Sequence, residues 1–99
     1  MGRSPVIPAP WSLTPLQARL LAYLAAAGPE CRTWQQIGNH IGGHRDGGIT
    51  DGCVRVHVFR IRRRMAGVHP HVIETWLGYG YRVAPDALDT VREGLRDVA

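Results

Sequence analysis

The chain has 99 residues, of which 44% are apolar, and it carries a formal net charge of +4. This length corresponds to one small domain that can bury a modest core without disulfide or metal support. No apolar run approaches the roughly 20 residues that span a bilayer, which argues against any association with membranes. The opening sequence, MGRSPVIPAPW, lacks an apolar segment of signal-peptide length, so we expect a complete small protein that stays in the cytoplasm.

Charge is distributed unevenly along the chain. Residues 1–84 hold ten arginines and four carboxylates, a net charge of +6, whereas residues 85–99 hold two arginines and four carboxylates, a net charge of −2. There is no lysine, and arginine makes bidentate contacts to phosphate and to guanine edges. A basic body with an acidic tail indicates a polyanionic partner for the body alone.

No residue pattern in the chain indicates catalysis or a cofactor. The eight carboxylates form no pair within a histidine-bearing or glycine-rich motif, so we expect no enzymatic activity. Cys31 and Cys53 are far apart and form no CxxC pattern, and we expect both to be thiols. Two glycines separate His40 from His44, which argues against a metal site on a shared helix face.

Residues 1–12 are rich in proline and are predicted to form an extended N-terminal segment, in which Val6 and Ile7 could form a short edge strand. The first helix follows, with Thr14 as its N-cap, Pro15 as its first residue and Gln17 completing a capping box. Gly28 and Pro29 end it. The apolar stripe of this predicted helix comprises Leu16, Leu20, Tyr23, Leu24 and Ala27.

A second helix is predicted after a short extended link. Thr33 caps it, and Gln36 again lies at the capping-box position. Its inner face comprises Trp34, Ile37 and Ile41. A glycine-rich loop then leads to Thr50, which we expect to cap the next helix.

That third helix, predicted over residues 50–66, is basic. Its apolar residues recur at i, i+4, i+7 and i+11, which is one helical stripe, namely Val54, Val58, Ile61 and Met65. Val56, Arg60 and Arg63 point away from this stripe, with Cys53 and Phe59 beside them. A helix that is apolar on one side and arginine-rich on the other suits a DNA major groove.

Two β segments follow around a turn flanked by Gly78 and Gly80. The first includes Val72, Ile73 and Thr75, and the second has an alternating pattern at Tyr79, Tyr81 and Val83. Three helices followed by this hairpin predict an α+β winged helix-turn-helix domain over residues 13–84. Residues 85–99 add a short amphipathic helix, whose apolar face comprises Leu88, Val91, Leu95 and Val98.

Three motifs in register resemble the DNA-binding domain of OmpR/PhoB-type response regulators. LTPLQARLLAYL is similar to the opening helix of that family, VRVHVFRIRRRM to its recognition helix and VIETWLGYGYRV to its wing. The resemblance covers residues 13–83. It implies binding of duplex DNA, with the recognition helix in the major groove and the wing on the neighbouring minor groove or its phosphates.

The resemblance also assigns roles to individual positions. His57, Arg60 and Arg62 match family residues that contact bases or phosphates, and Thr75 matches a wing residue that touches the DNA backbone. The loop from Gly42 to Thr50 lies where family members contact RNA polymerase, which makes His44, Arg45 and Asp46 candidates for a partner contact.

The chain departs from the family pattern in several places. We expect no receiver domain, and because only twelve residues precede Leu13, we expect the N-terminal sheet of the family to be nearly absent. Leu77 stands at a wing position where the family commonly has arginine. Arg55 replaces a common acidic residue, and Phe59 replaces a usually polar one.

The candidate DNA contacts differ in what each could do. We expect Arg60 to read a base edge, Arg63 to contact DNA, and Arg62 and Arg64 to reach phosphates. Cys53 and Val56 are either small spacers or readers of a thymine methyl group. For His57, core packing and phosphate contact are equally plausible.

The aromatic residues and the tail leave alternatives open. Phe59 could stack on a sugar or methyl group, or it could mark a protein interface. Packing is favoured over base stacking for Trp76, Tyr79 and Tyr81, although Tyr79 remains a candidate DNA contact. The tail helix either covers the core of its own domain or forms a homodimer through residues 86–98.

The leading interpretation is a small transcription regulator that binds duplex DNA with sequence selectivity. The alternatives are a winged helix that docks on another protein, such as RNA polymerase, and a sequence-blind DNA-coating protein. A steep dependence of affinity on salt would distinguish DNA binding from an apolar protein contact.

Overall fold

The computed structural model describes residues 10–42 and 51–96, with only the backbone described at Pro10 and Asp51. Within them lie four α-helices and a three-stranded antiparallel sheet, which confirms the predicted α+β winged helix. The elements are η1 (Pro10–Ser12), α1 (Pro15–Ala26), β1 (Arg32–Thr33), α2 (Trp34–Gly42), α3 (Asp51–Arg64), β2 (Ile73–Trp76), β3 (Gly80–Val83), η2 (Pro85–Ala87) and α4 (Leu88–Leu95).

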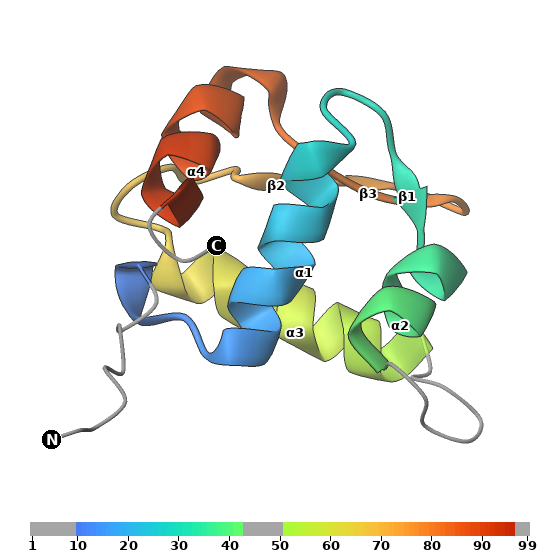
Figure 1. Cartoon of the computed structure of the whole chain (residues 1–99). Helices are drawn as coiled ribbons and strands as arrows, with labels where there is room; N and C mark the ends of the chain where they lie inside the picture. The colour runs from blue at the N-terminus through green and yellow to red at the C-terminus, as the bar shows by residue number, and fades with distance from the viewer. Residues whose placement is uncertain (1–9, 43–50, 97–99) are drawn as a thin grey trace, which may run out of the picture.

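Helix α1 lies at the centre of the molecule in Figure 1, with α2 and α4 on either side, the sheet behind its upper half and α3 behind its lower half. Its N-terminus has the predicted capping box, since the Gln17 amide donates to Thr14 Oγ1 and the Thr14 amide donates to Gln17 Oε1, each over 3.1 Å. The helix buries a broader face than predicted because it packs against α2, α3, α4 and β3. Its buried residues are Gln17, Ala18, Leu20, Leu21, Leu24 and Ala25.

The helix-turn-helix pair is α2 and α3. The second capping box is also present, because the Gln36 amide donates to Thr33 Oγ1 over 3.1 Å and the Thr33 amide donates to Gln36 Oε1 over 2.9 Å. Ile37 and Ile41 of α2 are buried. The apolar stripe of α3 is buried as predicted, comprising Val54, Val58, Ile61 and Met65.

The strand order is β1-β3-β2, so β3 is the central strand. β2 pairs with β3 in the register Ile73↔Val83 and Thr75↔Tyr81, and β1 pairs with β3 through Thr33↔Gly80. The sequence predicted only an extended link where β1 lies. Gly80 permits the pairing, because a Cβ at this position would overlap the Arg32 carbonyl.

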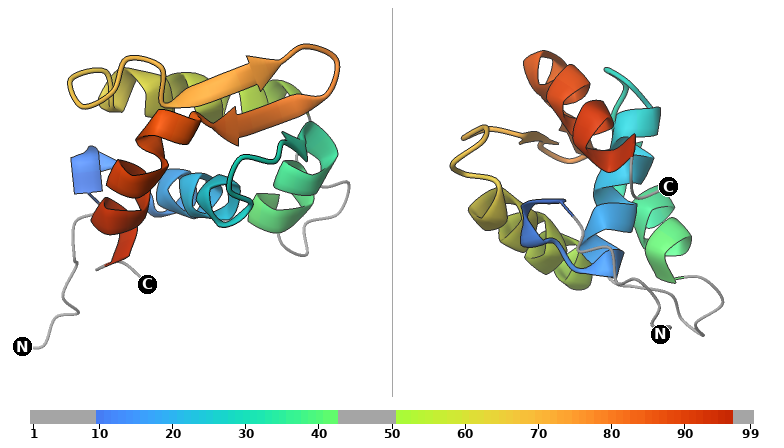
Figure 2. Two further views of the ribbon diagram at one scale, coloured as in Figure 1. Left: turned by 90° about the horizontal axis from the view of Figure 1, so that it is seen from above. Right: turned by 60° about the vertical axis from the view of Figure 1, so that its left-hand side comes forward.

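The wing, residues 73–83, is the β2–β3 hairpin with its turn, and it runs beside α3 (Figure 2). The Tyr79 amide donates to the Trp76 carbonyl over 2.9 Å, and Gly78 has a φ of +77°, which side chains disfavour. Tyr79 therefore belongs to the turn and not to the second strand, where it was predicted. Val72 lies just before β2, is buried, and accepts a hydrogen bond from the Ala84 amide over 2.9 Å.

Helix α4 packs on α1 of its own chain. Val91 is fully buried and Leu95 nearly so, and Arg92 Nε and Nη2 donate to the Ala25 carbonyl over 3.3 and 2.9 Å. The structure thus shows the first of the two arrangements predicted for the tail. A homodimer through the same apolar face would have to displace these contacts. Val98 lies outside the described residues.

The segment before α1 is not extended where the structure describes it, because residues 10–12 form a 3₁₀ helix. Trp11 and Ser12 have φ values of 60°, in the left-handed region that is costly for side chains other than glycine. The Trp11 ring packs closely against Gly94 of α4, where a Cβ would overlap it. The prolines of this segment favour an extended backbone, which is why the sequence predicted one. The packing of the Trp11 ring on α4 accompanies a different backbone conformation. Val6 and Ile7 are outside the described residues.

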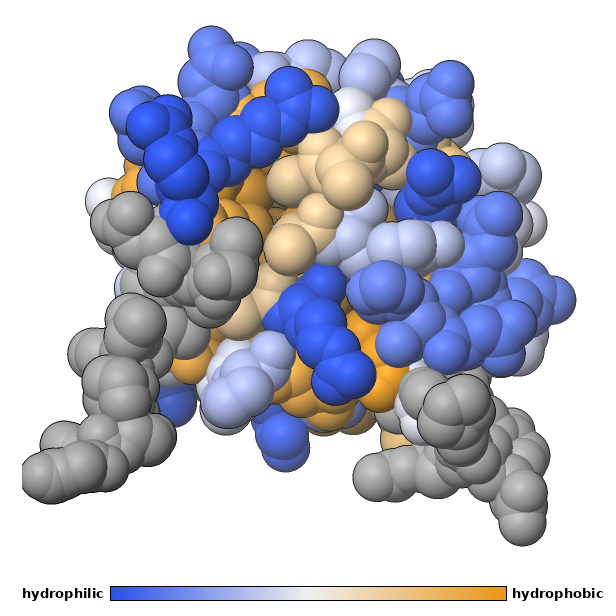
Figure 3. All heavy atoms as spheres, in the orientation of Figure 1, coloured by the Kyte–Doolittle hydropathy of each residue, from blue (hydrophilic) through white to orange (hydrophobic). Residues whose placement is uncertain are grey.

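The surface of α1 that faces the viewer in Figure 1 is only partly covered. In Figure 3, apolar side chains remain visible there between hydrophilic ones at the edges. Ala22 and Ala26 are exposed residues of α1.

Candidate nucleic-acid interface

The recognition face is the exposed side of α3, opposite the buried stripe. Its six members are all exposed, namely Cys53, Val56, Phe59, Arg60, Arg63 and Arg64. Phe59 is 56% exposed and Val56 is 45% exposed, so the core does not use these two apolar side chains. The structure therefore brings these predicted DNA contacts together on one surface.

Arginine and aromatic side chains are combined on this face. The Arg63 guanidinium lies over the Phe59 ring, 5.8 Å from its centroid, one helical turn along α3. The contact gives Phe59 a role in positioning Arg63, which the sequence did not indicate. Cys53, Val56 and Arg60 line a shallow groove with His57.

His57 lies at the edge of the recognition face and is half-buried. Burial lowers the pKa of its imidazole, and the nearby Arg60 guanidinium lowers it further. Its Nδ1 atom is buried and has no hydrogen-bond partner among the described residues. Both features favour the neutral form, so His57 resembles a core-edge residue more than a cationic phosphate ligand.

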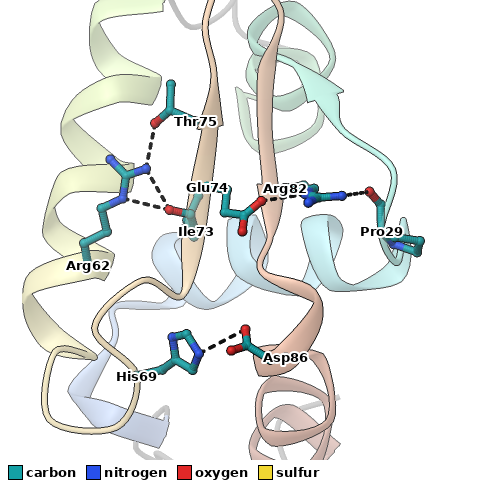
Figure 4. A network of polar contacts seen from close by, with 8 residues as sticks. All are labelled: Pro29, Arg62, His69, Ile73, Glu74, Thr75, Arg82 and Asp86. Atoms are coloured by element: carbon teal, nitrogen blue, oxygen red, sulfur yellow. Dashed lines mark hydrogen bonds and ion pairs between the residues drawn. The ribbon is translucent and has the colours of Figure 1, made fainter.

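Arg62 has a different environment from its neighbours on α3. Its Nε and Nη2 atoms donate to the Ile73 carbonyl over 3.1 and 2.7 Å, and Nη2 also donates to Thr75 Oγ1 over 2.7 Å (Figure 4). We call these three hydrogen bonds the Arg62 brace. The brace joins α3 to β2, so the recognition face and the wing are held in a defined relative orientation.

The wing has a second polar network on its other face. Arg82 Nε donates to Glu74 Oε1 over 2.8 Å, and Arg82 Nη1 donates to the Pro29 carbonyl over 3.0 Å (Figure 4). The same guanidinium lies over the Trp76 ring, 5.0 Å from its centroid. These contacts stiffen the base of the wing.

The tip of the wing is apolar and exposed. Leu77 is 94% exposed, Tyr79 53% and Trp76 48%, whereas Tyr81 is buried in the core. Tyr81 thus packs in the core as predicted, and the Trp76 ring packs on the Arg82 guanidinium within the wing, whereas Tyr79 is exposed at the turn. Between the wing and α3 lies an open groove of about 530 Å³, whose lining includes Trp34, Arg55, Arg62 and Thr75.

The sequence of residues 9–83 matches the family model described as "Transcriptional regulatory protein, C terminal". The chain belongs to this family. The OmpR/PhoB-type identification made from three motifs is thereby confirmed, and with it a DNA-binding, transcription-regulating domain. The family comprises DNA-binding regulatory domains and is not a family of enzymes. Among curated proteins, no sequence matches the chain.

Other predictions for this OmpR/PhoB-type domain concern a polymerase contact, a metal site and a membrane-spanning helix. His44, Arg45 and Asp46, the candidate polymerase contacts, lie outside the described residues. Within the described ranges, no group of three or more histidine, cysteine, aspartate or glutamate side chains could hold a metal ion. No helix in that part of the chain is long and apolar enough to cross a membrane.

Sequence reasoning missed the partners of two residues on the inner side of the wing. Arg62 was assigned to DNA phosphates, and Thr75 to the DNA backbone, but the structure pairs them with each other. In the sequence, the one feature that linked Arg62 with Thr75 was that both had been assigned to DNA contacts. Their proximity depends on how β2 packs beside α3, which no local pattern encodes.

Proposed function

We propose that this domain binds duplex DNA with sequence selectivity as a small transcription regulator. Helix α3 lies in the major groove, and the wing lies on the adjacent backbone or minor groove. The observation that carries this proposal is the arrangement of α3, whose apolar stripe is fully buried while arginines, small side chains and Phe59 cover its exposed side. A surface of this kind matches the depth and the charge of a major groove.

Each member of the recognition face has a role in this proposal. Arg60 reads a base edge, because it lies in the middle of the face beside small residues that permit close approach. Arg63 and Arg64 neutralise phosphates towards the end of α3. Cys53 and Val56 contact base methyl groups, and Phe59 packs on a sugar while it orients Arg63.

The wing residues act through the backbone of the DNA. Thr75 Oγ1 accepts a hydrogen bond from Arg62, which leaves the hydroxyl hydrogen available for a phosphate oxygen. Arg62 itself positions the wing through the brace. Tyr79 flanks the wing tip. The proposed role involves no catalysis and no cofactor, and it places the protein in the cytoplasm with the DNA.

The first experiment measures affinity for labelled random duplexes and for fragments of the source DNA at two salt concentrations. We expect log K to fall with log salt at a slope of roughly −4 to −5, corresponding to about four to six neutralised phosphates. Arg60→Ala should weaken binding to preferred fragments by about 10-fold or more, because a base contact is lost. Arg96→Ala, at the C-cap of α4, removes the same charge outside α3 and the wing and is the matched control.

The outcomes separate the candidate functions. Equal binding to all fragments would favour a DNA-coating protein over a regulator that selects its sites. An absence of binding at low salt would contradict the proposal. It would favour a protein-docking winged helix, with RNA polymerase among the candidate partners, for which the 56% exposed Phe59 is the supporting observation. In that case Phe59→Ala should reduce partner binding more than Arg60→Ala does.

A further inference from the structure

The tip of the wing carries three of the six large apolar residues that are exposed in the described part of the chain. Leu77, at 94% exposure, is the most exposed large apolar residue among those described, and the exposed rings of Trp76 and Tyr79 flank it. A contiguous exposed apolar patch of this kind marks a contact surface more often than a solvated one. The folded domain itself gains nothing from Leu77, since this side chain takes no part in the core.

The patch is held on a narrow, stiff support. Leu77 is at the second position of the turn Trp76–Tyr79, which is closed by the hydrogen bond from the Tyr79 amide to the Trp76 carbonyl. Gly78 supplies the positive φ that the third position requires. Below the turn, the Arg62 brace fixes β2 to α3. The tip is therefore a preorganised wedge and not a loose loop.

Cationic groups lie on both sides of the wing below this apolar tip. Arg55 and Arg62 line the groove on the inner side of the wing, and Arg82 lies on its outer side over the Trp76 ring. Glu74 is the one carboxylate between residues 73 and 83, and it is paired with Arg82 over 2.8 Å. An apolar point framed by positive charge fits a partner with an anionic exterior and an apolar interior. Duplex DNA has this chemistry, with phosphates outside and stacked bases within.

The wing is also continuous with the recognition face through the Arg62 brace. A duplex seated on α3 would therefore meet the wing tip at the neighbouring minor groove. We propose that Leu77 inserts between adjacent base pairs from the minor groove and bends the duplex, with Trp76 and Tyr79 packing on the flanking sugars. Apolar side chains that enter the minor groove unstack a base step and kink DNA in this way. This inference rests on the proposed DNA-binding function.

Insertion also restricts the sequences that the domain would accept. Pyrimidine–purine steps such as TA and CA unstack more easily than other steps. The preferred sites should therefore carry such a step where the wing tip meets the minor groove. The domain would thus select its DNA sites partly by how easily one base step deforms, in addition to the base contacts made by α3. Leu77 would contribute to this selection without a hydrogen bond to a base.

The test measures DNA bending by energy transfer between dyes at the two ends of a preferred duplex. In a second duplex, 2-aminopurine at the step beneath the wing reports unstacking through its fluorescence. The full chain is compared with Leu77→Ala, Leu77→Arg and Val68→Ala. Val68→Ala is the matched control, because it removes apolar surface from a residue that is 45% exposed and lies outside the wing.

We expect the unmodified protein and Val68→Ala to bend the duplex by about 20–90° and to raise the 2-aminopurine signal. Leu77→Ala should lose most of the bend and bind about 3- to 10-fold more weakly, with an unchanged salt slope. Leu77→Arg should bind with a slope steeper by about 1, because it adds a phosphate contact, but should not restore the bend. Circular dichroism should show all variants folded, since Leu77 is outside the core.

Equal bending by the unmodified protein and Leu77→Ala would overturn the insertion of Leu77. The DNA-binding function would then still stand on the loss caused by Arg60→Ala. If the unmodified protein binds no duplex at low salt, both proposals fail together. A straight duplex in every complex would overturn the insertion alone.

Discussion

His57 lies where the core and the exposed side of α3 meet. Its helical position left core packing and phosphate contact equally plausible, and the structure shows why: the residue is half-buried, and its Nδ1 atom faces away from water. Burial, aided by Arg60, lowers the pKa of the imidazole. The folded protein therefore binds a proton at this site less readily than the unfolded chain does.

This pKa shift predicts a loss of stability in acid. Above the ordinary histidine pKa of about 6.5, His57 is neutral in both states and contributes no pH dependence. As pH falls below that value, the unfolded chain is protonated first, so the unfolding temperature should fall until the folded state is protonated as well. His57→Gln, measured from pH 8 to pH 5, should show a smaller decline than the unmodified protein. His71→Gln, on the exposed loop before β2, is the control, and a decline identical in all three would contradict the assignment.

Individual residues could be predicted from sequence wherever their partners are local. Thr14 with Gln17, and Thr33 with Gln36, form capping boxes because each pair spans a single helical turn. The partners of Arg62 lie in another element, so its hydrogen bonds could not be foreseen. The same applies to Gly94, whose missing side chain makes room for Trp11 and does not simply weaken α4.

At the scale of elements, the recognition helix and the wing behave as one unit. The Arg62 brace connects them through a carbonyl and a hydroxyl of β2, and Ile73 is itself buried in the core. A guanidinium can reach both acceptors from one side chain because its N–H groups form a planar fork. The orientation of the wing thus depends on a residue of α3 that sequence comparison would assign to DNA.

Removing the brace should affect stability more than charge-dependent binding. Arg62→Ala should lower the free energy of unfolding by about 1–3 kcal/mol, because hydrogen bonds to a charged group are lost and the Ile73 carbonyl loses its donor. Arg62→Lys should recover only part of this loss. The salt slope of DNA binding should stay unchanged, whereas Arg64→Ala should reduce its magnitude by about 1. Denaturant unfolding and salt titrations measure both effects, and a reduced slope for Arg62→Ala would favour a phosphate contact instead.

The elements with regular periodicity could be predicted from the sequence, and those without it could not. The buried stripe of α3 follows directly from its spacing, so the recognition helix was found with its exposed side. β1 has two residues and no alternation, and it becomes a strand only because Gly80 of β3 lets it approach. The second strand of the wing also begins later than predicted. Tyr79 favours a β-strand by residue type, but its amide hydrogen bond to the Trp76 carbonyl makes it part of the turn.

At the scale of the whole molecule, the two ends of the described chain complete the core. Trp11 packs on Gly94, and α4 buries Val91 and Leu95 against α1. The apolar face of the tail was evident from its spacing. The surface on which this helix packs could not be predicted, because an amphipathic helix has the same pattern whether it covers its own domain or a second copy.

The position of α4 predicts that it stabilises the monomer. Val91→Ala should lower the free energy of unfolding by roughly 1–3 kcal/mol, because it leaves a cavity at a fully buried position. The unfolding temperature should drop by about 4–8 °C per kcal/mol, while DNA binding at 25 °C stays unchanged. Thr90→Ala, exposed on the same helix, is the control. If Val91→Ala instead altered only the oligomeric state in analytical ultracentrifugation, the tail would serve an interface between copies.

The pairing of β1 with β3 has a consequence for the order in which the domain assembles. Thr33 and Gly80 stand on either side of the entire α2–α3 unit, so their contact closes a long loop, and such contacts form slowly. During synthesis the three helices are made before β3. Until β3 pairs with β1 and β2, the side of α1 that packs on β3 stays uncovered, and the incompletely folded chain is most prone to misassociation.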